Sequence, residues 1–156
     1  MKKTALALAS SLLLLAACDS SSSGDGSAGG AGFGSTAPGT QGDLSTNVGD
    51  RVFFALDSSS LDGEAQSTLD RQANWLKQYS NVNVVIEGHA DERGTREYNL
   101  ALGERRASAA KNYLVNSGVS SARVSTISYG KERPAVMGSD ESAWSQNRRA
   151  VTVIAN

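Results

Sequence analysis

Two carboxylates and one arginine are the side chains of this sequence best placed to bind a small charged ligand. Asp57 follows the apolar run 52–56, and Asp91 closely follows the alternating segment 82–86. Arg106 lies in a helical segment, where a rotation of 100° per residue places it in the middle of the apolar face. Carboxylates accept hydrogen bonds from an ammonium group, and a guanidinium pairs with a carboxylate through two parallel bonds. The three side chains together would suit a zwitterion.

The same residues allow a purely structural interpretation. A guanidinium on an apolar face needs an anionic partner, and Asp91 is the expected one because it ends a strand where the helix begins. Such an ion pair would only hold the loop in place. Ligands of open α/β sheets bind beyond the carboxyl ends of the strands, which is where both Asp57 and Asp91 are expected. Periodicity does not choose between the ion pair and a ligand site.

The start of the Arg106 helix offers further groups for such a site. The first turn, near residues 95–99, has backbone N–H groups without helical partners, which suit a carboxylate. Thr95 lies in this turn, and Asn99 and Leu102 fall toward the Arg106 side of the helix. Arg105, on the opposite face, is expected to be an ordinary solvated charge.

Catalytic chemistry finds little support in the residue types. The chain has one histidine, His89, whereas a catalytic zinc site needs several ligands, and there is no Gly-x-Ser-x-Gly motif. Asp57 and Asp91 could pair as in a glycosidase, but an inward Arg106 would keep both ionised and leave no proton donor. We expect no enzyme, metal or cofactor, and we interpret His89 as a hydrogen-bonded structural residue. Arg148 and Arg149 could be a solvated strand start or could shape the site.

Hydrophobic periodicity predicts alternating strands and helices. The expected elements are a strand at 52–56, a helix at 65–79, a strand at 82–86, a helix at 98–116, a strand at 123–129, a short helix at 140–146 and a strand at 150–155. This βαβαβ(α)β order predicts one α/β domain, or α+β sandwich, in which helices cover a mostly parallel sheet.

The N-terminus has the pattern of a bacterial secretory signal. Lys2 and Lys3 precede a short apolar run that ends at Leu15-Ala16-Ala17-Cys18, which resembles a lipoprotein cleavage site. We therefore predict a signal peptide at 1–17 and lipidation of Cys18, which would anchor the chain to a membrane. The alternative is an ordinary signal peptide with an incidental cysteine.

Residues 18–50 are rich in Ser, Gly, Ala and Thr, a composition that predicts a flexible tether after the lipidated cysteine. A coil of this length would span roughly 30 Å on average. The folded domain is then expected at 51–156. The chain has 15 basic and 16 acidic residues, so no basic surface for nucleic acid is expected.

Two long segments resemble the OmpA-like C-terminal domain family. These are Gly88-His89-Ala90-Asp91-Glu92-Arg93-Gly94-Thr95 and the stretch from Tyr98 to Ala107, supported by 52–57, 128–136 and 147–151. The resemblance covers about 51–154 and is closest to the lipoprotein members of the family. It implies binding of meso-diaminopimelate in the peptide stem of peptidoglycan, with Asp91 on the ammonium and Arg106 on the carboxylate. It also implies that Asp57 is a further acceptor, with Thr95, Asn99 and Leu102 near the ligand.

The resemblance also implies partners and a location. Its lipoprotein members dock onto the periplasmic propeller protein TolB and other Tol-system proteins, and they are anchored in the outer membrane. Asp19 follows Cys18, and aspartate at this position favours retention in the inner membrane of enteric bacteria, depending on the next residue, here Ser20. We expect the outer membrane. Two alternatives stay open: a Tol-system interaction protein with incidental wall binding, and a peptidoglycan hydrolase.

Overall fold

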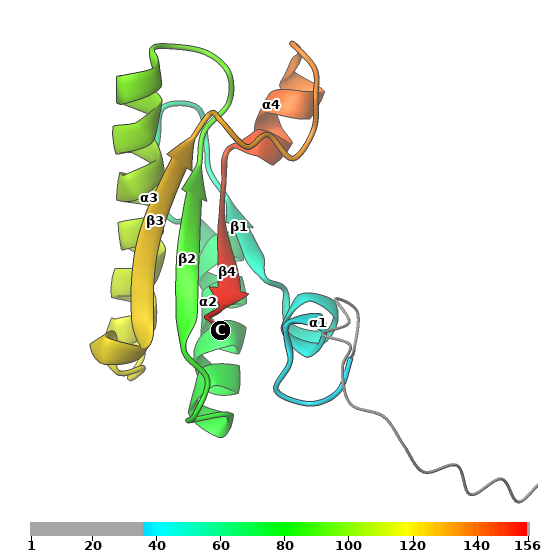
Figure 1. The fold of residues 1–156 in the computed structure, drawn as a ribbon, viewed down its shortest axis with the longest axis vertical. Helices are drawn as coiled ribbons and strands as arrows, with labels where there is room; N and C mark the ends of the chain where they lie inside the picture. Colours follow the sequence, from blue (N-terminus) through cyan, green and yellow to red (C-terminus); the bar gives the residue numbers. More distant parts are fainter. Residues whose placement is uncertain (1–35, 156) are drawn as a thin grey trace, which may run out of the picture. The chain divides into compact units, whose positions relative to one another are not determined.

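The computed structural model describes residues 36–155. The predicted signal peptide, Cys18 and the first part of the predicted tether lie outside this range. The elements in chain order are α1 (Gln41–Asp43), a π-helical turn (Leu44–Val48), β1 (Arg51–Phe53), α2 (Gly63–Gln78), β2 (Val84–His89), α3 (Arg96–Asn116), a 3-10 turn (Ser121–Arg123), β3 (Val124–Gly130), α4 (Glu141–Asn147) and β4 (Arg149–Ile154) (Figure 1). The expected order of strands and helices is confirmed.

The four strands of residues 36–155 form one sheet in the order β1-β4-β2-β3. β2 and β3 are parallel, whereas β4 runs antiparallel to both β1 and β2, with Val84 opposite Ile154 and Gly88 opposite Ala150. The α/β class is confirmed, but the expectation of a mostly parallel sheet is wrong. β1, β2 and β3 point the same way because α2 and α3 return the chain between them. The segment after β3 makes no such return, so β4 enters from the carboxyl end of β3 and runs back.

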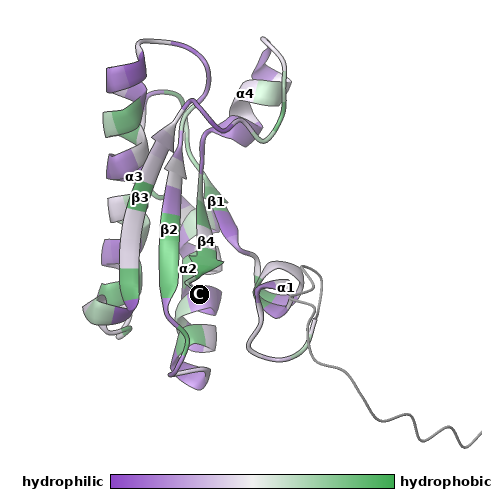
Figure 2. Ribbon diagram, in the orientation of Figure 1, coloured by the Kyte–Doolittle hydropathy of each residue, from purple (hydrophilic) through white to green (hydrophobic). Residues whose placement is uncertain are grey.

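Helices α2 and α3 pack on one face of the sheet, behind it in Figure 1. α2 begins at Asp62, whose carboxylate accepts the N–H of Ala65, and its apolar positions recur every three or four residues. The core consists of these helix positions and of alternate strand residues such as Val84 and Ile86. Figure 2 shows the result as hydrophobic stretches on β2 and β4, with hydrophilic residues distributed along α3.

The folded region begins before Arg51, so the predicted boundary at that residue is too late. Leu44 is fully buried in the core, and the buried Asp43 accepts a hydrogen bond of 2.8 Å from Trp75 Nε1. Gln41 bonds to the backbone of β4 at Thr152 and Ile154. The polar composition gave no sign that this segment belongs to the folded domain, because its contact with the core depends mainly on one apolar residue, Leu44.

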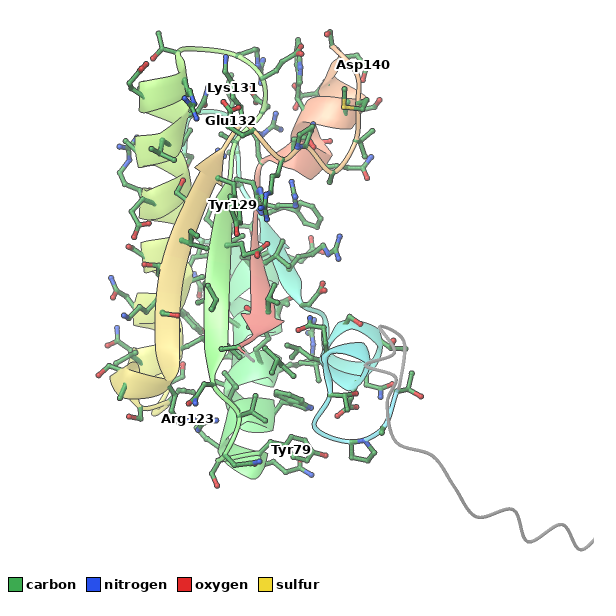
Figure 3. All side chains as sticks on the ribbon, viewed as in Figure 1. Tyr79, Arg123, Tyr129, Lys131, Glu132 and Asp140 are labelled. Carbon is green, nitrogen blue, oxygen red and sulfur yellow. The ribbon has the colours of Figure 1, made fainter. Side chains whose placement is uncertain are left out.

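β1 is also less buried than its apolar sequence suggested. Phe53 is 46% exposed while Val52 is 3% exposed, so the strand buries one face and not two. At the far end of the domain, Arg123 donates hydrogen bonds to the carbonyls of Tyr79 and Val82, which ties the start of β3 to the chain before β2 (Figure 3).

Two glycines let α3 lie directly on β2. A Cβ on Gly88 would be 1.8 Å from the carbonyl oxygen of Gly103, and a Cβ on Gly103 would be 2.8 Å from the carbonyl oxygen of Gly88. No side chain fits between the helix and the strand here. This close approach brings the inward face of α3, with Arg106, onto the carboxyl end of β2.

We expect Gly88→Ala to destabilise the domain by about 2–3 kcal/mol, because the added methyl group must push α3 away from β2. The free energy of unfolding, from urea denaturation followed by circular dichroism, measures this. Gly63→Ala is the matched control, since a Cβ at Gly63 meets nothing within 4 Å. Equal stability of the two variants would contradict the close packing.

Candidate functional site

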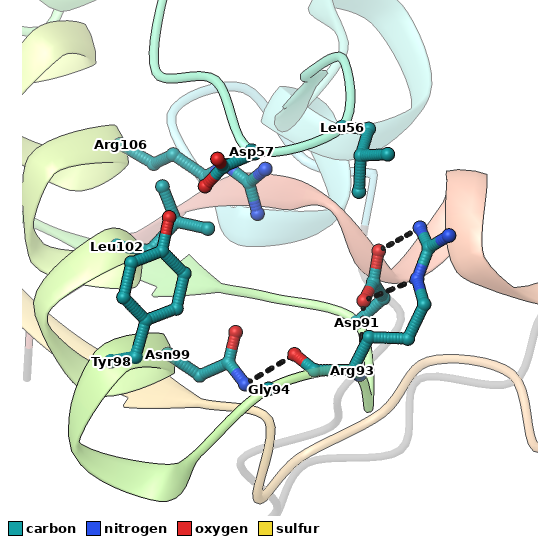
Figure 4. A pocket seen from close by; sticks show the side chains of 9 residues that line it. All are labelled: Leu56, Asp57, Asp91, Arg93, Gly94, Tyr98, Asn99, Leu102 and Arg106. Carbon is teal, nitrogen blue, oxygen red and sulfur yellow. Dashed lines mark hydrogen bonds and ion pairs between the residues drawn. The ribbon is translucent and has the colours of Figure 1, made fainter.

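A pocket of about 300 Å³ opens beyond the carboxyl ends of β1 and β2, next to the first three turns of α3 (Figure 4). Nine residues line it: Leu56, Asp57, Asp91, Arg93, Gly94, Tyr98, Asn99, Leu102 and Arg106. Five of the six predicted site residues are among them. Thr95 is not, because it caps α3 and its hydroxyl accepts the N–H of Tyr98 at 3.3 Å.

Arg106 is fully buried and faces inward, as predicted. Its guanidinium donates to three carbonyl oxygens: Ser58 at 2.8 Å, His89 at 2.8 Å and Ala55 at 3.1 Å. A guanidinium has five N–H donors. The described residues thus leave one donor on each terminal nitrogen, which is the number a bidentate carboxylate needs.

The predicted direct ion pair between Arg106 and Asp91 is not formed. Carbonyl groups satisfy the buried guanidinium instead, and Asp91 acts on it only through its charge. Burial lowers the pKa of Arg106 to about 10, opposed by the attraction of Asp91 and reinforced by the repulsion of Arg148. Arg106 therefore remains cationic at neutral pH, and its three carbonyl bonds tie the β1–α2 loop to the end of β2.

Asp91 is 5% exposed and is held by two arginines. Arg93 donates from Nη2 at 2.7 Å, from Nε at 3.2 Å and from its backbone N–H at 3.1 Å, and Arg148 Nη1 lies 3.5 Å away. Burial raises the pKa of Asp91, but the bonds from Arg93 and Arg148 outweigh it and lower the pKa below its ordinary value. The pocket therefore contains a buried, ionised carboxylate.

Asp57 presents a second carboxylate on the other side of the pocket. It lies in the loop after β1, is exposed, and has a positive φ of 54°. Figure 4 shows it beside Arg106 and Leu102, across the pocket from Asp91. Because the neighbouring Ala55 and Ser58 both bond to Arg106, the guanidinium fixes the loop that carries Asp57.

Sequence reasoning missed Arg93, Tyr98, Leu56 and Gly94 as lining residues. Arg93 could have been suspected, since a side chain two residues after a loop aspartate can reach back to it.

The sequence allowed Arg148 and Arg149 to be either a solvated strand start or residues that shape the site. Both are buried. Arg148 bonds to the carbonyl of Phe54 at 3.0 Å and contacts Asp91, so it shapes the site. Arg149 bonds to the carbonyls of Asn147 and Arg133 instead. Neither is a solvated strand start.

His89 differs from the expected hydrogen-bonded histidine. It is 2% exposed, and neither ring nitrogen has a hydrogen-bond partner among residues 36–155. The closest carboxylate oxygen, on Glu87, is 3.7 Å from Nε2. Burial, together with the positive charges of Arg149 and Arg133, lowers the pKa of His89 to about 4. The ring is therefore neutral at neutral pH.

We expect acid to weaken the fold through His89. Histidine in an unfolded chain titrates near 6.5, so between about pH 6.5 and 4 the unfolded chain binds more protons than the folded one, by up to one. The free energy of unfolding should be unaffected above pH 6.5 and should fall between about 6.5 and 4, by up to about 1.4 kcal/mol per pH unit. Urea denaturation of the wild type and of His89→Leu measures this. The variant should lose this part of the slope, and identical slopes would contradict the assignment.

Among residues 36–155 no group of three or more His, Cys, Asp or Glu side chains could hold a metal ion. No helix in the same range is long and apolar enough to cross a membrane.

Comparison with known families matches residues 53–148 to the OmpA family. The chain belongs to the OmpA family. Within it, the chain is similar to proteins named peptidoglycan-associated lipoprotein. It is 58% identical to the one from Rhizobium meliloti (strain 1021), over 91% of this chain and 82% of the relative. It is 48% identical to the one from Pseudomonas aeruginosa, over 92% of this chain and 91% of the relative.

Solved structures also show similarity to this chain. The crystal structure of the peptidoglycan-associated lipoprotein from Burkholderia pseudomallei is 43% identical, with a TM-score of 0.66 over 68% of this chain and 90% of that one. The C-terminal domain of Helicobacter pylori MotB is 19% identical, with a TM-score of 0.64 over 69% of this chain and 84% of that one, and shows the fold alone. The curated relatives are named for association with peptidoglycan and not for a reaction, in agreement with a protein that is not an enzyme.

Proposed function

We propose that this protein is a lipoprotein that binds peptidoglycan non-covalently and ties the outer membrane to the cell wall. The ligand is meso-diaminopimelate in the stem peptide, a residue whose free end has an ammonium and a carboxylate on one carbon. The ammonium binds the Asp91 carboxylate, and the carboxylate binds the remaining donors of Arg106. Asp57 is a further acceptor, and Asn99 and Leu102 line the pocket.

One observation carries this proposal. Two opposite charges, Asp91 and Arg106, are both buried at one pocket, yet they do not neutralise each other by direct contact. Burying charges is costly, so two opposite buried charges that served stability alone would be expected to form a direct ion pair. Arg106 keeps two donors for the carboxylate of a zwitterion, and Asp91, which Arg93 and Arg148 hold ionised, is the acceptor for its ammonium. The names of the relatives point to the same polymer.

The N-terminal part of the proposal concerns anchoring. Acylation of Cys18 would attach the chain to the outer membrane. The predicted tether after Cys18 would let the domain reach the wall. The 17 residues between Cys18 and residue 36, if fully extended, would reach about 60 Å. Outer-membrane placement, rather than inner-membrane retention through Asp19, suits a protein that binds the wall from outside.

Tol-system proteins, TolB first, are the proposed protein partners. This proposal is carried over from the family, whose lipoprotein members dock onto TolB with a surface that overlaps the peptidoglycan site. The rim of the pocket offers the exposed apolar side chains Leu56 and Tyr98, which suit a protein contact.

The test is co-sedimentation of the purified full chain with isolated sacculi. Retention is expected on intact sacculi, together with release by a soluble stem peptide that contains meso-diaminopimelate. Sacculi stripped of stem peptides are the control and should not retain the chain. Retention on stripped sacculi would contradict the assignment of meso-diaminopimelate as the ligand. No retention on either material, with TolB still bound, would favour the Tol-system alternative, and release of soluble wall fragments would favour a hydrolase.

A further inference from the structure

The carboxylate proposed to bind the ligand's ammonium already has an occupant. Arg93 Nη2 and Nε bond to the two oxygens of Asp91 at 2.7 and 3.2 Å, as a bidentate pair. Figure 4 shows the Asp91 carboxylate meeting the Arg93 side chain within the pocket lining. The guanidinium of Arg93 thus occupies the position at which the ammonium of a ligand would have to bind.

The two arginines on Asp91 differ in their freedom to move. The Arg148 side chain is 8% exposed and is also bonded to Phe54 and Glu141. The Arg93 side chain is 34% exposed, and among residues 36–155 its guanidinium has no hydrogen-bond acceptor other than Asp91. Arg148 is therefore a fixed support of the carboxylate, and Arg93 is displaceable.

A stacking contact holds Arg93 from the other side. Its guanidinium carbon lies 3.9 Å from the centre of the Trp144 ring in α4, which is cation–π geometry. The ring is itself held, because Trp144 Nε1 donates to Glu92 at 3.1 Å. The negative charges of Glu92 and Glu141 also favour a cation here, so a displaced Arg93 would still have acidic groups nearby.

We infer that Arg93 is a resident competitor of the ligand: it occupies the ammonium subsite in the free protein, and the ammonium must displace it. This inference rests on the proposed function. Displacement exchanges one charge-assisted pair on Asp91 for another. The backbone N–H of Arg93 and the side chain of Arg148 stay on the carboxylate, so Asp91 keeps its position and charge without the Arg93 side chain.

The Arg93 side chain therefore lowers the affinity of the pocket that it lines. The opposite interpretation, that it supports the site, predicts weaker binding when it is removed. The two interpretations differ in the sign of one measurement.

The experiment titrates the full chain in detergent with a soluble tripeptide stem that ends in meso-diaminopimelate, followed by calorimetry. Arg93→Ala should bind about tenfold more tightly than the wild type, because no pair on Asp91 has to be broken. Arg96→Ala is the matched control. It removes the same charge three residues away, from a side chain that is 75% exposed and paired with Glu132, and it should leave the affinity within about twofold.

Trp144 supplies a second readout. Its fluorescence should change on ligand binding in the wild type, where Arg93 leaves the ring, and should stay unchanged in Arg93→Ala. The second tryptophan, Trp75, is buried away from the pocket lining and hydrogen-bonded to Asp43, so it serves as a constant background.

Each outcome of these experiments either supports or overturns the inference. Tighter binding by Arg93→Ala, with the Trp144 signal lost, supports the inference. Equal or weaker binding by Arg93→Ala overturns it, while the proposed function stands if Asp91→Ala abolishes binding. Absence of binding by the wild type, or full binding by Asp91→Ala, overturns both.

Discussion

Arg106→Ala is expected to abolish retention on sacculi and to lower the free energy of unfolding by at least about 3 kcal/mol. The substitution leaves a cavity in place of a fully buried side chain. It also removes the donor shared by the carbonyls of Ala55, Ser58 and His89, so the β1–α2 loop loses its link to β2. Sacculus co-sedimentation and urea denaturation measure the two effects.

A conservative variant separates binding from folding. Arg106→Lys keeps the charge, but one ammonium cannot reach three carbonyls and also pair with a carboxylate through two bonds. It should remain folded and bind at least tenfold more weakly. Arg105→Ala is the control. Arg105 is the exposed neighbour of Arg106, so the loss of its side chain should change the free energy of unfolding by no more than about 0.5 kcal/mol. Normal binding by Arg106→Lys would mean that the guanidinium serves the fold alone.

Asp91→Asn is expected to weaken binding by about a hundredfold, or about 2.7 kcal/mol. The amide has nearly the shape of the carboxylate and can still accept the backbone N–H of Arg93. It has no charge for the ammonium, which would then face Arg93, Arg106 and Arg148 without compensation. Calorimetric titration with the diaminopimelate stem peptide measures this loss, and circular dichroism checks that the variant is folded.

Asp57→Asn provides the comparison. Asp57 is exposed, so water screens its charge, and its loss should reduce affinity by about tenfold or less. If Asp57→Asn proved more damaging than Asp91→Asn, the ammonium would have been assigned to the wrong side of the pocket.

The helices and strands could be predicted from the sequence because apolar residues recur with clear periods. The direction of β4 could not. Periodicity shows that a strand exists, but the direction depends on whether the preceding segment crosses the sheet, and α4 stays at one end. The early start of the fold, at Gln41–Asp43, was hidden for a similar reason: the single buried Leu44 gives no period.

At the site, the helical period placed Arg106 correctly because a charge in the middle of an apolar face stands out. Its partners were mispredicted because they are backbone carbonyls, which have no signature in a sequence. The partners of Asp91 were missed for another reason. Arg93 and Arg148 are long side chains whose reach depends on loop geometry, and Arg148 lies between α4 and β4, directly before the strand whose direction was unforeseen.

The central claim is that one pocket binds both ends of a zwitterion. The most direct test compares two stem peptides that differ by one carboxylate, one ending in meso-diaminopimelate and the other in L-lysine. Both carry the ammonium for Asp91, but only the first carries the carboxylate for Arg106. The wild type should bind the diaminopimelate peptide at least tenfold more tightly, and the preference should shrink in Arg106→Lys. Equal affinity of the wild type for both peptides would contradict the account.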